Sequence, residues 1–140
     1  MSAVTTLQAG KSGAVPTVSA QADTVGMKVR FGGFSSAGQK ARNDDAVAAE
    51  LPVLASVAAM KGAVACIADG VSESDRSHLA SQLSVTQFIE DYYATPDSWS
   101  VEESAARVLR SINDWLCGQS RLATAGAMVT TFSAAVIKSR

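Results

Sequence analysis

The sequence predicts an α+β fold in which an antiparallel sheet carries two adjacent antiparallel helices on one face. Three observations support this prediction. Short apolar or alternating segments typical of strands occupy the chain between residues 27 and 68, two helix-like segments then follow each other directly, and a β-branched segment covers residues 129–137. Because β-α-β winding would place a strand between the two helices, this order favours separate layers of helix and sheet.

The first expected strand is the stretch MKVRFGG, in which apolar and basic residues alternate with a period of two. The paired glycines Gly32 and Gly33 indicate a bulge or a close backbone approach. AVAAEL (46–51) is a second short strand that ends at Pro52, and residues 53–60 fit either a strand or a helix. After a turn at Lys61 and Gly62, the uninterrupted apolar run AVACIA (63–68) predicts a central strand covered on both faces.

Two helices are expected between residues 75 and 118. The first has Ser74 or Asp75 as its N-terminal cap and ends before Pro96; its apolar face is formed by Leu79, Leu83, Phe88, Ile89 and Tyr92. The second begins at a capping box of Ser100 and Glu103 and ends near Gly118. Its apolar face consists of Val101, Ala105, Val108, Ile112, Trp115 and Leu116. Both Trp99 and Trp115 are expected to be core residues. The last strand is expected at residues 129–137.

Composition excludes several classes of function. The chain has 140 residues, is 47% hydrophobic and carries a formal net charge of -1, which argues against a nucleic-acid surface or a polybasic membrane patch. No apolar run is long enough to span a bilayer, and the N-terminus lacks the apolar region of a signal peptide. We therefore expect a mobile tail over residues 1–26, with a lead-in strand as the alternative, one domain over residues 27–140, and a cytoplasmic location.

Acidic residues lie where expected strands begin and end. Asp44 and Asp45 precede one strand, and Asp69 ends another immediately before Gly70. Carboxylates that converge repel each other unless they are separated, protonated or bound to a cation, and hard divalent cations prefer oxygen ligands. The residues alone leave two readings open: a metal site, or a helix cap at Asp69 with a solvated turn at Asp44. The lone His78 is expected to be a surface or packing residue.

Three motifs appear in the order and at the spacing of a known family. GQKARNDDAVAA, ACIADGVSESDRSHLAS and GAMVTTFSAAVI, with two helices between the last two, resemble the N-terminal half of PPM-type metal-dependent serine/threonine phosphatases. The intervening helices are most similar to the phosphatase part of bacterial proteins that join such a phosphatase to a protein kinase. The resemblance implies a PPM-like β-sandwich, here truncated, and a parent protein that hydrolyses phosphoserine and phosphothreonine on proteins.

The same resemblance implies roles for five residues. Asp69 would bridge two Mn²⁺ or Mg²⁺ ions with the Gly70 carbonyl as a further ligand, while Asp44 would bind one ion through water and Asp45 would support the site. Lys40 stands where many members have the arginine that holds the substrate phosphate, and lysine lacks the bidentate fork of arginine. No covalent phosphoenzyme is implied, because the nucleophile would be the water between the ions.

The family also uses aspartates from a C-terminal half that this chain lacks, so the chain alone is expected to be inactive. The expected partners are a phosphoprotein substrate and a fused or separate protein kinase. The uncharged strand at residues 129–137 also predicts self-association, because it would offer an unpaired edge and an uncovered apolar face. The alternative function is a non-catalytic interaction module derived from the phosphatase fold.

Overall fold

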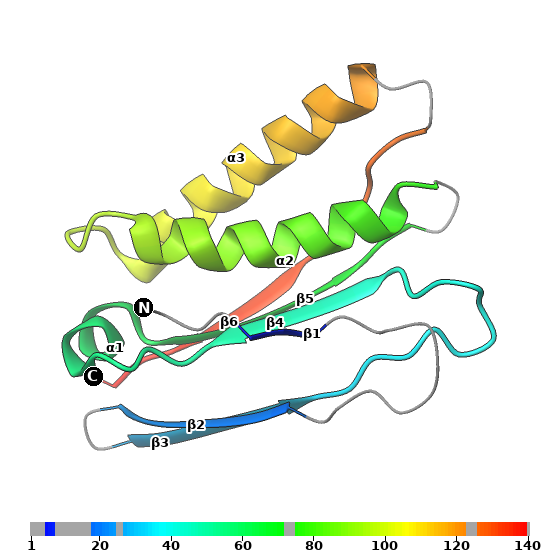
Figure 1. Cartoon of the computed structure of the whole chain (residues 1–140). Coiled ribbons are helices and arrows are strands. Elements are labelled where there is room, and N and C mark those ends of the chain that lie inside the picture. The colour runs from blue at the N-terminus through cyan, green and yellow to red at the C-terminus, as the bar shows by residue number, and fades with distance from the viewer. Residues whose placement is uncertain (1–4, 8–17, 25–26, 72–74, 123–125, 140) are drawn as a thin grey trace.

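A four-stranded antiparallel sheet forms the centre of the molecule (Figure 1). The computed structural model describes residues 5–7, 18–24, 27–71, 75–122 and 126–139. The strands lie in the order β1 (Thr5–Leu7), β4 (Asp45–Glu50), β5 (Ala63–Asp69) and β6 (Ser133–Ile137). A separate hairpin pairs β2 (Val18–Thr24) with β3 (Met27–Gly33). The helices are α1 (Ala55–Lys61), α2 (Ser77–Ala94) and α3 (Val101–Leu122).

Helices α2 and α3 lie on one side of this sheet and the β2–β3 hairpin lies on the other (Figure 1). α2 packs on β4 and β5, and α3 packs against α2. The predicted α+β fold, with antiparallel strands and two adjacent helices on one face, is therefore confirmed. The hydrophobic core lies between the sheet and the two helices, and its largest members are Val64, Cys66, Val85, Phe88, Ile89, Tyr92, Val108, Ile112, Leu116 and Met128.

The central strand β5 is covered by the helices on one face, and on the other face it is buried only at its start, where Ala63 is 3% exposed. Its even-numbered residues Val64, Cys66 and Ala68 are buried under the helices, whereas Ile67 on the other face is 57% exposed. The prediction that this strand is covered on both faces therefore holds at its start and is wrong at its end, where Ile67 and Asp69 are exposed. An uninterrupted apolar run does not distinguish a strand between two layers from a strand whose outward residues are simply apolar.

Regular structure begins earlier in the chain than the sequence suggested. β1 pairs with β4, and β2 pairs with β3, in the segment for which we expected a mobile tail. For these residues the alternative of a lead-in strand describes the chain better. The ambiguous segment before Lys61 is helical, as α1, and the first predicted strand extends over the whole of β3.

The buried face of α2 is made of small polar residues in its first half. Ser77, Ser81 and Ser84 are buried, whereas Leu79 and Leu83, which we expected in the core, are exposed. Phe88, Ile89 and Tyr92 in the second half are buried as predicted. The helix follows Arg76 without a side-chain cap, so Asp75 does not cap it, and Ser74 lies outside the described residues.

The start of α3 agrees with the sequence, but its end does not. The Ser100 hydroxyl accepts a hydrogen bond from the Glu103 amide at 3.1 Å, as a capping serine does, while the Glu103 carboxylate pairs with Arg107 instead of completing the box. The helix continues through Gly118 to Leu122. Trp115, predicted in the core, is 48% exposed, and Trp99 is half-buried with the Arg107 guanidinium 4.5 Å from its ring centre.

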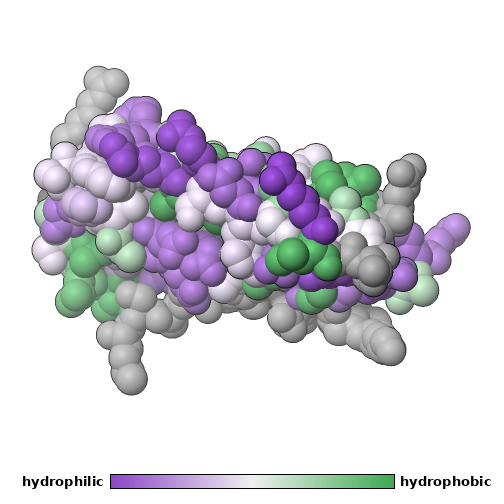
Figure 2. Space-filling view, turned by 90° about the horizontal axis from the view of Figure 1, so that it is seen from above, coloured by the Kyte–Doolittle hydropathy of each residue, from purple (hydrophilic) through white to green (hydrophobic). Residues whose placement is uncertain are grey.

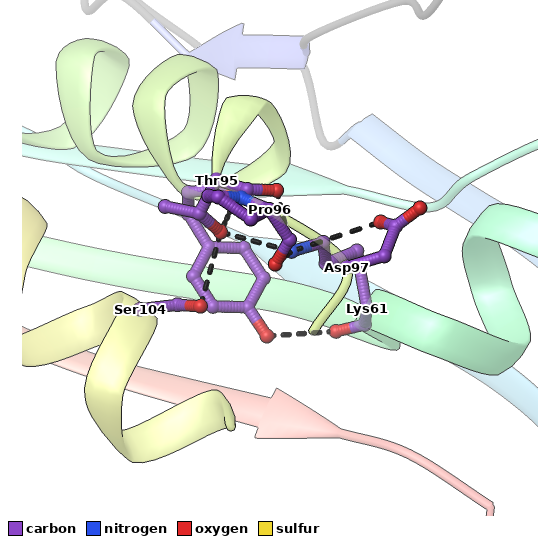
Figure 3. Close-up of polar contacts among 6 residues, drawn as sticks. Lys61, Thr95, Pro96, Asp97 and Ser104 are labelled. Carbon is purple, nitrogen blue, oxygen red and sulfur yellow. Dashed lines mark hydrogen bonds and ion pairs between the residues drawn. The ribbon is translucent and has the colours of Figure 1, made fainter. Parts of the chain in front are cut away.

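Lys61 joins the end of α1 to the end of α2 (Figure 3). Its buried ammonium donates hydrogen bonds to the carbonyl and hydroxyl oxygens of Thr95 at 2.8 and 2.9 Å and to the Pro96 carbonyl at 3.0 Å. In return, the Tyr92 hydroxyl donates to the Lys61 carbonyl at 2.9 Å. A cation at the C-terminal end of a helix satisfies carbonyls that have no partner within the helix and opposes the negative end of the helix dipole.

The helical side of the molecule is largely polar at its surface, with smaller apolar patches (Figure 2). One of these patches is a shallow groove between α2 and α3 lined by Leu83, Ile112 and Trp115 among others. Among the residues that the structure describes, no helix has the length and apolar character needed to cross a bilayer.

Candidate functional site

Two paired strands, β4 and β5, bring an acidic row to one end of the sheet, next to the segment that leads into β6. Asp45 at the start of β4 lies opposite Asp69 at the end of β5. On the other side of Asp69, the Thr131 amide donates to its carbonyl at 2.8 Å, and the Asp69 amide donates to the Thr131 hydroxyl at 3.1 Å. Asp45 and Asp69 alternate with the buried Ala46 and Ala68, so both point to the sheet face opposite the helices.

The register makes Asp45 and Asp69 a close pair. The Gly70 amide donates to the Asp44 carbonyl at 3.0 Å, so the neighbouring residues Asp44 and Gly70 form the hydrogen-bonded position of the β4–β5 ladder. Asp45 and Asp69 therefore occupy the adjacent non-hydrogen-bonded position, where Cα atoms approach to about 4.5 Å and side chains are closest. Like charges placed directly opposite each other in this way destabilise a sheet.

The pKa of Asp45 reflects this crowding. It lies above the ordinary value because burial disfavours the charged carboxylate and because the Asp69 carboxyl hydrogen-bonds to it and repels its negative charge. The positive charge of Lys40 acts in the opposite direction. The two carboxyls are thus arranged so that a proton or a cation between them is favoured over two bare charges.

Asp44 is held by partners of its own. Its carboxylate accepts hydrogen bonds from the Ser77 hydroxyl at 2.8 Å and from Arg42 Nε at 3.2 Å, and its carbonyl accepts one from the Ser81 hydroxyl at 2.5 Å. Burial by itself would raise the pKa of Asp44, but the hydrogen bonds from Ser77 and Arg42, together with the charges of Arg42 and Lys40, bring the pKa below its ordinary value. Asp44 is therefore an ionised, buried anchor between β4 and the start of α2.

Gly70 lies where the backbone of α2 reaches the sheet. A Cβ at this position would stand 2.4 Å from the Ser77 carbonyl oxygen and 2.9 Å from that of Asp44. Only glycine leaves room for the strand end, the helix start and the Asp44 loop to meet here. The close backbone approach is a sufficient structural reason for this residue, with or without a ligand at its carbonyl.

Lys40 stands in the loop before these carboxylates. Its amide donates to the Ala37 carbonyl at 3.0 Å in a turn, and its side chain is exposed. Because its charge lowers the pKa of both Asp44 and Asp45, the ammonium lies within electrostatic reach of the acidic row. A cation beside a pair of acidic ligands is suited to attract an anionic group to them.

Sequence reasoning missed Arg42, Ser77, Ser81 and Thr131. Ser77 and Ser81 are four residues apart in α2 and so lie on one helix face. This spacing was the feature of the sequence that could have indicated a shared role for the two serines. Ser77 is buried and donates to the Asp44 carboxylate. His78 is partly buried with Nδ1 unpaired, and Glu73, which is close in the sequence, lies outside the described residues.

Two carboxylates form only part of a metal centre. Within the described ranges, no group of three or more histidine, cysteine, aspartate or glutamate side chains converges as a metal site would require. Asp45 and Asp69 are hard oxygen ligands on an open face, which suits Mg²⁺ or Mn²⁺, but they leave most of the coordination shell to other donors. No family model, no curated protein and no solved structure matches this chain.

Proposed function

We propose that this chain supplies one part of a divalent-cation site that hydrolyses phosphoserine and phosphothreonine on proteins, in the manner of PPM-type phosphatases. The observation that carries the proposal is the close, in-register pair of Asp45 and Asp69 on the open face of the sheet. The three ordered motifs of the sequence converge on this row, since the first supplies Asp45, the second Asp69 and the third Thr131.

The electrostatics of the pair favour a cation. Two carboxylates about 4 Å apart repel by roughly 4 kcal/mol at an effective dielectric constant near 20. Burial is the largest cause of the raised pKa of Asp45, followed by the hydrogen bond with the Asp69 carboxyl and this repulsion. Lys40 offsets part of this repulsion, and the open position of the pair at a strand end leaves it accessible to an ion from solution.

Each residue then has a distinct task. Asp45 and Asp69 hold the cations, with the Gly70 carbonyl as a further donor, and Lys40 orients the substrate phosphate by its charge. Asp44 positions this row through Ser77 and Arg42. Bound Mg²⁺ or Mn²⁺ supplies Lewis-acid chemistry that activates water and offsets the charge of the phosphoryl group.

The presence of two carboxylates also affects the choice between a catalytic chain and a non-catalytic module. Two side-chain ligands support weak cation binding but not a complete hydrolytic centre. We therefore assign catalysis to a whole protein in which other segments supply the remaining oxygen ligands, and expect the chain by itself to bind cations without efficient turnover. The partners of that protein are phosphoprotein substrates and an associated kinase, and its location is cytoplasmic.

Calorimetric titration with Mn²⁺ tests the proposal. We expect weak binding by the parent chain, with a dissociation constant on the order of 10⁻⁴–10⁻³ M, the range of sites with few charged ligands. Asp69→Asn should abolish this binding, because it removes one of the two carboxylates that hold the ion. Asp114→Asn, which removes an exposed carboxylate from α3, is the matched control and should bind as the parent does. Equal affinity in the parent and in Asp69→Asn would disprove the site.

A further inference from the structure

The strand β6 has one paired edge and one unpaired edge within the described part of the chain. It pairs with β5 and stands last in the order of the sheet, whereas β1 occupies the corresponding position beside β4. Its sequence SAAVI carries no charge, and most of its residues are exposed. Natural edge strands are usually protected by charges, proline or bulges, and β6 has none of these.

The register identifies which backbone groups are free. The Thr131 amide bonds to the Asp69 carbonyl and the Val71 amide bonds to the Val129 carbonyl, so odd-numbered residues of this segment bond to β5. The register between β5 and β6 stays constant from Ala63–Ile137 to the bridge between Gly70 and Thr130. The amide and carbonyl groups of the even-numbered residues Ala134 and Val136 therefore point away from β5, toward the open edge.

These groups can bond to the same strand of a second copy. In an antiparallel pair around a two-fold axis at Ala135, Ala134 lies opposite Val136 of the other copy, so outward-pointing residues meet outward-pointing residues. An axis placed between two residues would set outward groups against inward ones and is excluded. Axes at Ala134 or Val136 would also set outward groups opposite each other, but each would pair only three of the five residues Ser133–Ile137, whereas the axis at Ala135 pairs all five. Because β6 is uncharged, the pairing places no like charges opposite each other.

We propose that two copies of this chain associate through β6, in an antiparallel register centred on Ala135, to form one continuous eight-stranded sheet. The two-fold axis is perpendicular to the sheet, so both open faces point the same way and the exposed Ile67 and Ile137 of the two copies line one surface. A single strand pair buries less than the roughly 800 Å² per partner of a standard interface, so the dimer forms reversibly with concentration.

A charge swap at the axis tests the proposal. Ala135 is exposed in the single chain, so Ala135→Lys and Ala135→Glu should each fold, as circular dichroism can verify. In the dimer, residue 135 faces its own copy at a non-hydrogen-bonded position, where side chains are closest. Sedimentation at micromolar concentrations should show a dimer for the parent. Each variant alone should dimerise at least about tenfold more weakly, and the equimolar mixture of the two should restore the dimer.

Ile67→Lys separates edge pairing from stacking of the open faces. This side chain lies on the open face but on β5, away from the unpaired edge, and it is 57% exposed. We expect Ile67→Lys to dimerise as the parent does, whereas face-to-face stacking would be lost. A parent that stays monomeric, a dimer insensitive to Ala135→Lys, or a dimer abolished by Ile67→Lys would overturn the proposal. Asp69→Asn should dimerise normally, since the inference does not rest on the acidic pair.

Discussion

At the scale of single residues, the sequence located the acidic end of the sheet but not the way its members are used. Asp69 and Gly70 drew attention because a carboxylate followed by glycine ended an apolar strand. The pairing of Asp69 with Asp45 depends on the β4–β5 register, and the burial of Asp44 depends on Ser77, which lies 33 residues away. Spacing along the chain carries no information about either contact until the strands and α2 are placed.

Gly70→Ala tests the close approach at this point. A Cβ would overlap the Ser77 carbonyl, which belongs to backbone and cannot rotate away, so α2 or the strand end must shift. Overpacking of this kind costs about 1–3 kcal/mol, and we expect the free energy of unfolding to fall by roughly 2 kcal/mol in urea titrations. An unchanged midpoint would mean that α2 does not rest on Gly70.

Gly118→Ala is the matched control for this substitution. Gly118 lies inside α3, and no atom stands within 4 Å of the Cβ that alanine would add. Because glycine disfavours the interior of a helix, this variant should gain about 0.5–1 kcal/mol of stability. The two substitutions are chemically identical, so opposite signs would isolate the steric effect at Gly70.

At the scale of elements, the sequence predicted which segments are helices better than which faces they bury. The face of α2 was read from its large apolar residues, and Leu79 and Leu83 proved exposed. The start of this helix lies close to Asp44 and Gly70, and the hydroxyls of Ser77 and Ser81 find partners at Asp44. Hydrophobic periodicity detects a face that is large and apolar, and misses one that is small and hydrogen-bonded.

The Lys61 ammonium is one of the contacts that join α1 to α2. Lys61→Met keeps the length of the side chain but leaves the carbonyls of Thr95 and Pro96 without their donor (Figure 3). Hydrogen bonds from a charged donor contribute about 1.5–3 kcal/mol, so thermal or urea denaturation should show a loss of about 2 kcal/mol. Asp97 lies 3.9 Å from the same ammonium but is 63% exposed, so Asp97→Asn should cost less than about 0.5 kcal/mol. Equal losses in the two variants would contradict this account.

At the scale of the whole molecule, the fold class followed from the order of the segments, because two consecutive helices exclude alternating winding. The coverage of the sheet did not follow. Ala63–Asp69 was apolar enough to predict two covering layers, and the structure buries the face toward the helices but the opposite face only at Ala63. The open face carries Asp45 and Asp69 at one end and Ile137 at the other, so the uncovered surface and the candidate site are parts of the same face.

The two carboxylates on the open face determine the activity that we expect from the chain. With Mn²⁺ present, we expect the chain by itself to show little or no hydrolysis of p-nitrophenyl phosphate or phosphopeptides above a Mn²⁺ blank. Asp45 and Asp69 offer two ligands, and each transition-state interaction of about 1.4 kcal/mol that is lost lowers the rate roughly tenfold. Robust Mn²⁺-dependent turnover that disappears in Asp69→Asn would contradict this expectation. Repeating the assay with Ala135→Lys would then locate the missing ligands: turnover that falls with dimerisation places them in a second copy, and turnover that persists places them within one chain.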